Sequence, residues 1–308
     1  MEKSELFSAI HRLYDKYKNL TEGLPAQYIP ELAKVDPDQF AIAITDCQGK
    51  TFTVGDADKT FTLQSTSKPF VYALALEQNG VDFVHTKVGV EPTGEVFNSI
   101  IELEEKQHRP FNPMINSGAI ATAALIRGSN ASEKLGAVTK FFQDLTGQPA
   151  EINNAVFKSE KETAHRNRAI AHLMKHFSVM ESDIEETLDL YFQQCSINVS
   201  TKGLAVAAAT LANKGINPIT QKKIIESKYV KNTLSLMFTC GMYDSAGEWA
   251  FNVGVPAKSG VSGALFAVVP GQFGIAVYSP RINSHGHSIR GQKLITDLAR
   301  ELNIHMFG

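Results

Sequence analysis

Segments typical of β-strands lie near both ends of this 308-residue chain, and segments typical of helices fill the region between them. FAIAIT at 40–45 and TFTV at 51–54 are apolar and β-branched, as strands are. Near the C-terminus the same character appears in EWAFNVG (248–254), VSGALFAVVP (261–270) and GIAVYS (274–279). Because strands must pair with other strands, the simplest assembly is one antiparallel sheet built from both chain ends.

Apolar residues at helical spacing predict a helix at each end of the chain, next to this sheet. Residues 2–19 place Leu6, Ile10 and Leu13 on one face, and 288–302 read as a last helix. We therefore predict an α+β fold in which 1–64 and 219–308 form the antiparallel sheet with flanking helices. Residues 65–218 form an inserted, mainly helical domain, and the active site lies in the cleft between the two.

Charge and composition exclude several classes of function. The net charge is −2, so the chain lacks the basic field that binds nucleic acid. Its longest apolar run, LAVAAATLA at 204–212, is too short to cross a membrane, and the charged first residues do not resemble a secretory signal. Three widely separated cysteines read as reduced thiols, which predicts a cytoplasmic protein.

One short motif, Ser65-Thr-Ser-Lys68-Pro69, suggests nucleophilic chemistry. On a helix, residues three apart share a face, so Lys68 could accept the Ser65 hydroxyl proton if its pKa were lowered. The alternative is structural: Ser65 or Thr66 caps a helix whose first turn holds Pro69. By itself the motif does not decide between them, because chance supplies roughly 1.5 such matches in a chain of this composition.

A second motif, Lys258-Ser259-Gly260, favours the catalytic interpretation over a solvated lysine at a turn. S-x-x-K opening a helix, with K-[ST]-G on a late strand, is the arrangement of serine β-lactamases and penicillin-binding proteins. That framework has a third element, often S-x-N. Ser196-Ile197-Asn198 fits its letters, although so short a pattern is weak evidence.

Longer stretches resemble one branch of this framework, the serine-dependent glutaminases. They run in order along nearly the whole chain and include AQYIPELA (26–33), GDADKTFTLQSTSKP (55–69), FKSEKETAHRNRAI (157–170), CGMYD (240–244) and PAKSGV (256–261). The resemblance implies a β-lactamase/transpeptidase-like fold and hydrolysis of L-glutamine to L-glutamate and ammonia. It also implies a γ-glutamyl-serine intermediate, and a homodimer or homotetramer as the assembled form.

The same resemblance assigns roles to individual residues. It implies that Ser65 is the nucleophile, Lys68 its base and Tyr243 a proton carrier kept acidic by the nearby Lys258. It also implies a substrate-binding set comprising Tyr28, Ser65, Asn116, Glu160, Asn167, Tyr191, Tyr243 and Val261. Glu160 would receive the α-ammonium group, and Val261 would contact the substrate through its backbone N–H.

Without the resemblance, most of these residues have ordinary structural explanations. Glu160 stands among other charges and would read as a solvated helix residue. The amides of Asn116 and Asn167 suit caps and turns as well as ligands, and Tyr191 lies on an apolar helical face. Tyr243, close to Gly241 and Asp244, is harder to explain as a core residue.

The expected chemistry needs only a small-molecule substrate and water, with no metal and no organic cofactor. Two alternatives share the framework. A β-lactam-recognising hydrolase would use the same serine and lysines, and a non-catalytic amino-acid sensor would need the ammonium-binding site but not the serine–lysine pair.

Overall fold

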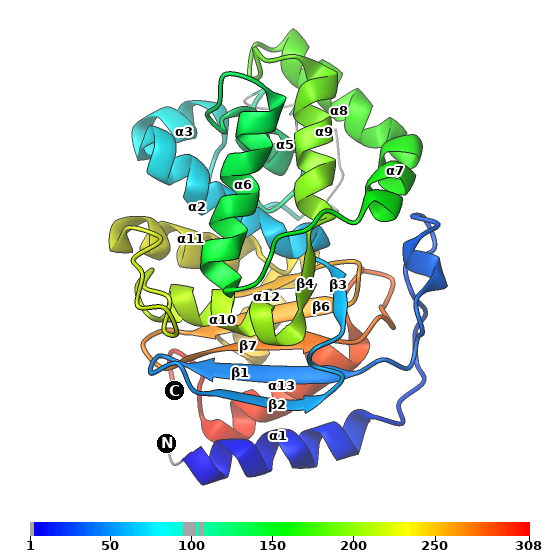
Figure 1. The fold of residues 1–308 in the computed structure, drawn as a ribbon, viewed down its shortest axis with the longest axis vertical. Coiled ribbons are helices and arrows are strands. Elements are labelled where there is room, and N and C mark those ends of the chain that lie inside the picture. Colours follow the sequence, from blue (N-terminus) through cyan, green and yellow to red (C-terminus); the bar gives the residue numbers. More distant parts are fainter. Residues whose placement is uncertain (1–2, 95–102, 105–107) are drawn as a thin grey trace.

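The computed structural model describes residues 3–94, 103–104 and 108–308. Its centre is a five-stranded antiparallel sheet in the order β2-β1-β7-β6-β5. The strands are β1 (Ala41–Asp46), β2 (Thr51–Gly55), β5 (Ala257–Ser259), β6 (Ala264–Val269) and β7 (Phe273–Tyr278). β1 pairs with β7 in a register that sets Ala43 opposite Ala276, so the two chain ends meet at the middle of the sheet (Figure 1). The predicted α+β class is confirmed.

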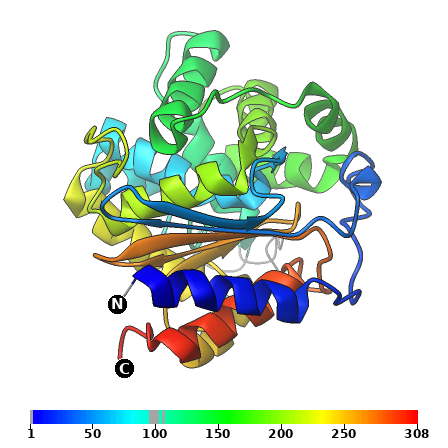
Figure 2. The same ribbon diagram turned by 60° about the horizontal axis from the view of Figure 1, so that its bottom comes forward.

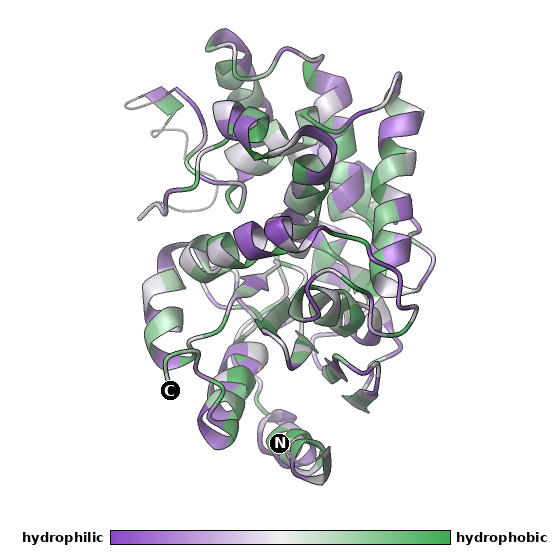
Figure 3. Ribbon diagram, turned by 90° about the vertical axis from the view of Figure 1, so that its left-hand side faces the viewer, coloured by the Kyte–Doolittle hydropathy of each residue, from purple (hydrophilic) through white to green (hydrophobic). Residues whose placement is uncertain are grey.

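Side chains of the sheet alternate between two apolar cores. Ile42, Ile44 and Val277 point to the core shared with the terminal helices α1 (Lys3–Tyr17) and α13 (Ile289–Leu302). α1 and α13 lie side by side on that face (Figure 2). α1 is amphipathic, as its mixture of hydrophilic and hydrophobic residues shows (Figure 3), and this pattern explains why it covers a sheet rather than standing free.

The opposite face of the sheet is covered by α10 (Thr201–Ala212), which packs against β7, β1 and β6. This helix contains the alanine-rich run that was too short for a membrane span. Within the described residues, no helix is long and apolar enough to cross a bilayer. The division into 1–64 with 219–308 and 65–218 stays a prediction, and α10 falls in the second segment although it lies on the sheet.

Further helices of the described residues, from between α1 and α10 in the sequence, form a group beyond α10 (Figure 1). They are α2 (Lys68–Asn79), α3 (Val81–Lys87), α5 (Asn116–Ala124), α6 (Ala131–Thr146), α7 (Asn154–Thr163), α8 (His165–His176) and α9 (Ile184–Cys195). A short ladder of β3 (Thr60–Thr62) and β4 (Asn198–Ser200) joins this group to the sheet region, and α11 (Ser227–Cys240) packs against α2.

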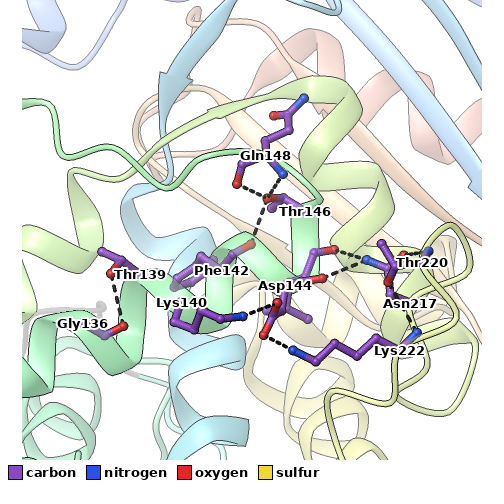
Figure 4. Close-up of polar contacts among 11 residues, drawn as sticks. Gly136, Thr139, Lys140, Phe142, Asp144, Thr146, Gln148, Asn217, Thr220 and Lys222 are labelled. Carbon is purple, nitrogen blue, oxygen red and sulfur yellow. Dashed lines mark hydrogen bonds and ion pairs between the residues drawn. The ribbon is translucent and has the colours of Figure 1, made fainter.

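Polar contacts at the end of α6 hold the segments on either side of α10, and Figure 4 shows those with Asn217. Asn217 is fully buried, and its Nδ2 donates to the backbone oxygens of Asp144 and Leu145 at 2.9 and 3.1 Å. At the other end, Gln148 accepts a hydrogen bond from the Ser200 hydroxyl at 3.0 Å, and this same hydroxyl caps α10 by accepting from the Gly203 N–H. Backbone oxygens at a helix end need such partners, so this network stabilises α6 while it positions α10.

The close approach of α10 to the sheet depends on Gly274 in β7. A Cβ at this position would lie 2.2 Å from the backbone nitrogen of Ala209. We expect Gly274→Ala to destabilise the protein by about 1–3 kcal/mol, since helix and strand would have to move apart. Thermal unfolding would measure this, with Gly136→Ala in α6 as a control, because an added Cβ there meets nothing within 4 Å. Equal melting temperatures for Gly274→Ala and wild type would refute the packing argument.

One predicted strand is wrong. Residues 248–254 fall largely in the helix α12 (Ala246–Asn252), and the third C-terminal strand is β5, which carries Lys258. Ala246, Trp249 and Val253 are buried at intervals of three and four, which is helical periodicity, while Phe251 is 85% exposed. The indole N–H of Trp249 donates to the Val255 backbone oxygen at 2.9 Å and anchors the helix end. Tertiary burial of this one face overrides the β-propensity of the aromatic residues.

Candidate active site

Residues far apart in the sequence line one small cavity of about 110 Å³. Seven members of the predicted substrate-binding set line it: Tyr28, Ser65, Asn116, Glu160, Asn167, Tyr191 and Val261. Pockets for drug-sized ligands measure roughly 300–1,000 Å³, so a cavity this small suits a molecule the size of an amino acid.

The turn that carries Ser65 is a 3-10 helix, η2 (Gln64–Ser67), and α2 begins only at Lys68. A 3-10 helix has three residues per turn, so positions i and i+3 are eclipsed, which aligns Ser65 with Lys68 more closely than an α-helix does. Gln64, just before the serine, has a left-handed φ of 49°, and such strain in a non-glycine residue is concentrated at functional sites.

The capping alternative for Ser65 does not describe this turn. The Thr66 hydroxyl donates to the Leu63 oxygen at 2.5 Å and the Ser67 hydroxyl to the Gln64 oxygen at 2.8 Å. Both residues are buried, whereas Ser65 is partly exposed and lines the cavity. Of the three adjacent hydroxyls, two therefore serve the turn and Ser65 faces the space where a ligand can bind.

Lys68 lies behind the cavity, fully buried at the start of α2. Its Nζ donates to Asn116 Oδ1 at 2.7 Å and lies 5.7 Å from the centre of the Tyr243 ring. Burial lowers the pKa of Lys68 to about 8, against smaller opposing effects of Cys195 and Glu160. An amine with such a pKa is neutral in a useful fraction of molecules near neutral pH and can then accept a proton.

Tyr243 and Lys258 complete the polar group beside Ser65. The Tyr243 hydroxyl is hydrogen-bonded to Ser65, and the Lys258 Nζ lies 3.9 Å from the centre of the Tyr243 ring. Burial, and then the charge of Lys68, holds the pKa of Lys258 well below its ordinary value. Two desolvated lysines therefore flank one buried phenol.

The expectation that Lys258 keeps Tyr243 acidic is wrong. Burial raises the pKa of Tyr243 above its ordinary value, and the hydrogen bond with Ser65 lowers it by a smaller amount. Desolvation disfavours the phenolate, and this effect of burial outweighs the others that act on Tyr243. Tyr243 is a neutral phenol that can donate one proton and accept another.

Asn116 connects Lys68 to the opposite wall of the cavity. Its Oδ1 accepts from Lys68 and, at 3.3 Å, from the Tyr191 hydroxyl, while its Nδ2 donates to Asn167 Oδ1 at 3.0 Å. These bonds fix the orientation of the Asn116 amide, because its oxygen has two donors and its nitrogen has an acceptor. The structure thus brings Asn116, Asn167 and Tyr191 together in one network.

Glu160 is buried on the cavity wall rather than solvated, with 7% exposure. Burial raises its pKa to about 8, although hydrogen bonding from Gln64 and the charge of Lys68 lower it. In the part of the chain that the structure describes, no Lys, Arg or His lies within 4 Å of its oxygens. A buried carboxyl without a cationic partner is unfavourable unless a ligand supplies the cation.

Tyr28 and Val261 form the rim and one wall of the cavity. Tyr28 is 54% exposed, yet its hydroxyl lies where burial and then the charge of Glu160 raise its pKa. Val261 is buried directly after the Lys258-Ser259-Gly260 motif. Both come from outside the helical group, so the cavity is closed only when the chain ends fold against it.

The sequence motifs did not indicate six residues that line the cavity, namely Ile29, Gln64, Thr163, Ala164, Arg166 and Cys195. Gln64 Nε2 lies 3.4 Å from Glu160 Oε2, and its place beside Ser65 was the only available signal. Conversely, neither Ser196 nor Asn198 lines the cavity, although their letters fit the S-x-N element. Across 3–94, 103–104 and 108–308, no group of three or more His, Cys, Asp or Glu side chains is placed to hold a metal ion.

Comparisons with known proteins agree on one family. A family model described as "Glutaminase" matches residues 23–307. A protein named "Glutaminase" from Trichormus variabilis is 54% identical over 304 residues, covering 99% of this chain and 91% of its own. Another, from Clostridium tetani, is 44% identical and is covered to 99%.

Solved structures give the same result for the fold. One described as "Probable glutaminase ybaS" matches all of this chain and 99% of its own with a TM-score of 0.97 at 39% identity. A probable glutaminase of Bacillus subtilis matches 98% of this chain and 96% of its own with a TM-score of 0.88 at 37% identity. A structure titled as the glutamate form of Mglu matches 96% of this chain and 69% of its own with a TM-score of 0.92 at 39% identity.

Proposed function

Because the chain belongs to the glutaminase family and is an amidohydrolase acting on L-glutamine, we propose that it works through a γ-glutamyl ester on Ser65. One observation carries this proposal. Ser65 is the only hydroxyl of its turn that lines the cavity, and it is hydrogen-bonded to Tyr243 beside two buried lysines whose pKa values are lowered.

In the first half-reaction, Ser65 Oγ attacks the side-chain carbonyl carbon of glutamine and its proton passes to neutral Lys68. The backbone N–H groups of Ser65 and Val261 hold the developing oxyanion, and losing one such donor costs about 2.7–4 kcal/mol in related chemistry. The C–N bond then breaks, and Tyr243 gives a proton to the departing ammonia and regains one from Lys68.

In the second half-reaction, water attacks the ester, glutamate leaves and the Ser65 hydroxyl is restored. The water gives its proton to the same group of bases that served the first step. Atoms balance with glutamine and water as the only reactants, so the proposed reaction uses no metal and no organic cofactor.

The two charged ends of the substrate have distinct partners in this proposal. Glu160 receives the α-ammonium group, which supplies the cation that its buried carboxyl lacks. The amides of Asn116 and Asn167 face the α-carboxylate, while Tyr28 and Tyr191 enclose the carbon chain. With both ends fixed, the side-chain amide is held at Ser65, which reduces the entropy lost in reaching the transition state.

Replacing the ammonium partner separates binding from chemistry. We expect Glu160→Gln to raise KM for glutamine by about 10²-fold or more, because the buried ammonium loses its counter-charge. The control is Glu162→Gln, an exposed residue of the same helix α7. An unchanged KM in Glu160→Gln would reject the ammonium site.

The same substitution has a second readout in stability. A carboxyl whose folded pKa is raised to about 8 stabilises the fold below pH 4.5, and this contribution is lost as pH rises through 8. At pH 8–9 we therefore expect Glu160→Gln to melt higher than wild type, by about 2–4 °C for each kcal/mol relieved. A lower melting temperature at that pH would contradict the burial argument.

An assay for glutamate and ammonia over a panel of amides tests the function directly. Glutamine should be the preferred substrate, and trapping with a reactive glutamine analogue should add one γ-glutamyl-sized group to Ser65. Acylation by penicillin without ammonia release would favour the β-lactam alternative, and glutamine binding without turnover would favour the sensor.

For location and assembly, we propose a cytoplasmic homodimer or homotetramer. The three cysteines, Cys47, Cys195 and Cys240, are free, which supports a reducing compartment. Light scattering would test the assembly, and a monomer at micromolar concentration would reject it.

A further inference from the structure

The loop before α13 contacts Tyr243 and its surroundings from outside the cavity. Side-chain hydrogen bonds fix the shape of this histidine loop, Asn283–Ser288. Asn283 Oδ1 accepts from the backbone N–H groups of His285 and His287, each at 3.0 Å. At its end, Ser288 donates to the Ser279 oxygen at 2.9 Å and caps α13 by accepting from the Gly291 N–H. A loop braced at both ends can hold its side chains in fixed positions.

His287 lies fully buried against Tyr243. The two rings are nearly parallel, with an interplanar angle of 14° and centroids 5.9 Å apart. The Nδ1 of His287 is 2.7 Å from the Ser259 hydroxyl, and Ser259 is the neighbour of Lys258 on β5. His287 therefore links the Tyr243 ring to the strand that carries the second lysine.

Two further contacts of the histidine loop involve the residue after Tyr243 and the wall of the cavity at Val261. His285 Nδ1 is 2.8 Å from a carboxylate oxygen of Asp244, the residue after Tyr243. Gly286 approaches the Val261 side chain so closely that an added Cβ would meet it at 3.3 Å. The loop thus contacts the turn that carries Tyr243. It also contacts Val261, whose backbone N–H is proposed to hold the oxyanion.

Tyr243 needs such support because its own backbone does not favour its position. Its φ is 55°, a left-handed value that costs of the order of 1–3 kcal/mol in a non-glycine residue and persists only when surrounding contacts enforce it. The Lys258 ammonium over its ring constrains the position of the ring, and the parallel His287 ring restricts how the ring can tilt.

We infer that His287 is a positioning residue, whose ring, stacked on Tyr243, holds the Tyr243 hydroxyl within reach of Ser65. It acts through Tyr243 and does not contact the substrate. Burial, and then the charge of Lys258, lowers the pKa of His287 to about 4. With so low a pKa the ring is too weak a base to take up a proton at working pH. The inference rests on the role of Tyr243 in the proposed function.

Two substitutions separate the effect of the His287 ring from the effect of its bond to Ser259. His287→Asn keeps a polar atom near the Nδ1 position and removes the ring, whereas His287→Phe keeps a ring and removes the bond to Ser259. We expect His287→Asn to lower kcat by about 10- to 100-fold, as small misplacements of catalytic groups do. KM should stay within about twofold, because the substrate contacts remain, and His287→Phe should recover most of kcat.

The control is His305→Phe, the same change at a part-buried, hydrogen-bonded histidine that does not line the cavity. Thermal unfolding of every variant separates misfolding from misplacement. If His287→Phe does not fold, His287→Asn in the Tyr243→Phe background gives the answer by itself. Non-additivity is the expected result: the double variant should match Tyr243→Phe alone to within about threefold.

Other outcomes overturn the inference. Wild-type kcat in His287→Asn rejects it, and so does an equal loss in kcat with and without the Tyr243 hydroxyl, or a loss confined to KM. If Tyr243→Phe by itself keeps wild-type kcat, the role of Tyr243 in the proposed function fails too. If Tyr243→Phe lowers kcat while His287→Asn keeps the wild-type kcat, the positioning role of His287 is rejected and the role of Tyr243 stands.

Discussion

Ser65→Ala is expected to lower ammonia release from glutamine by at least about 10⁴-fold, because no γ-glutamyl ester can form without the hydroxyl. The fold should survive. Ser65 is partly exposed, and the hydrogen bonds that build its turn come from Thr66 and Ser67. The variant should still bind glutamine, because Glu160, Asn116 and Asn167 are unchanged.

Ser262→Ala is the matched control. It makes the same chemical change three residues after Ser259, at a buried hydroxyl that has no hydrogen-bond partner among the described residues. Turnover in this control should be near that of wild type. If Ser65→Ala turned over glutamine at a rate near the control, the nucleophile assignment would be wrong.

Lys68→Met should have the second largest effect, a loss of about 10³-fold or more in kcat/KM. Methionine fills a similar volume but cannot take the Ser65 proton, and general-base catalysis contributes about 10²–10⁴-fold. It also leaves the Asn116 oxygen with only the 3.3 Å bond from Tyr191, so some loss of substrate orientation adds to the effect. Lys158→Met, on the exposed side of α7, is the control.

The dependence of activity on pH is a second test of the role of Lys68. With a pKa of about 8, Lys68 is neutral in about one tenth of molecules at pH 7. Activity that needs the neutral amine should rise with pH and level off above about 8. Ionisation of Glu160, whose pKa is raised to a similar value, adds to this rise. We expect the rise to persist in Glu160→Gln. In the residual rate of Lys68→Met it should be smaller, because only the part due to Glu160 remains.

A profile that falls between pH 6 and 8 would contradict the neutral-base role of Lys68. So would a rise that Glu160→Gln abolishes, because the carboxyl would then account for all of it. Either result leaves the family and the reaction unchanged and alters only the proton acceptor.

Local patterns in the sequence predicted the elements whose signals are themselves local. The terminal helices, β1, β2, β6 and β7 follow from apolar periodicity, and their antiparallel sheet is the simplest way to pair strands from both ends. EWAFNVG was misread because aromatic and β-branched residues occur in strands and in buried helices alike. Only the burial of Ala246, Trp249 and Val253 distinguished the two.

The candidate site divides in the same way. Ser65 and Lys68 are three residues apart, so any helical turn brings them together, and the sequence by itself determined that pairing along with the family. Only the tertiary structure decided that Glu160 is buried, that Tyr243 stays a neutral phenol and that His287 stacks on it. The physical reason is that desolvation sets these properties. A side chain loses water only when segments remote in the sequence close around it, and no local pattern records which segments those are.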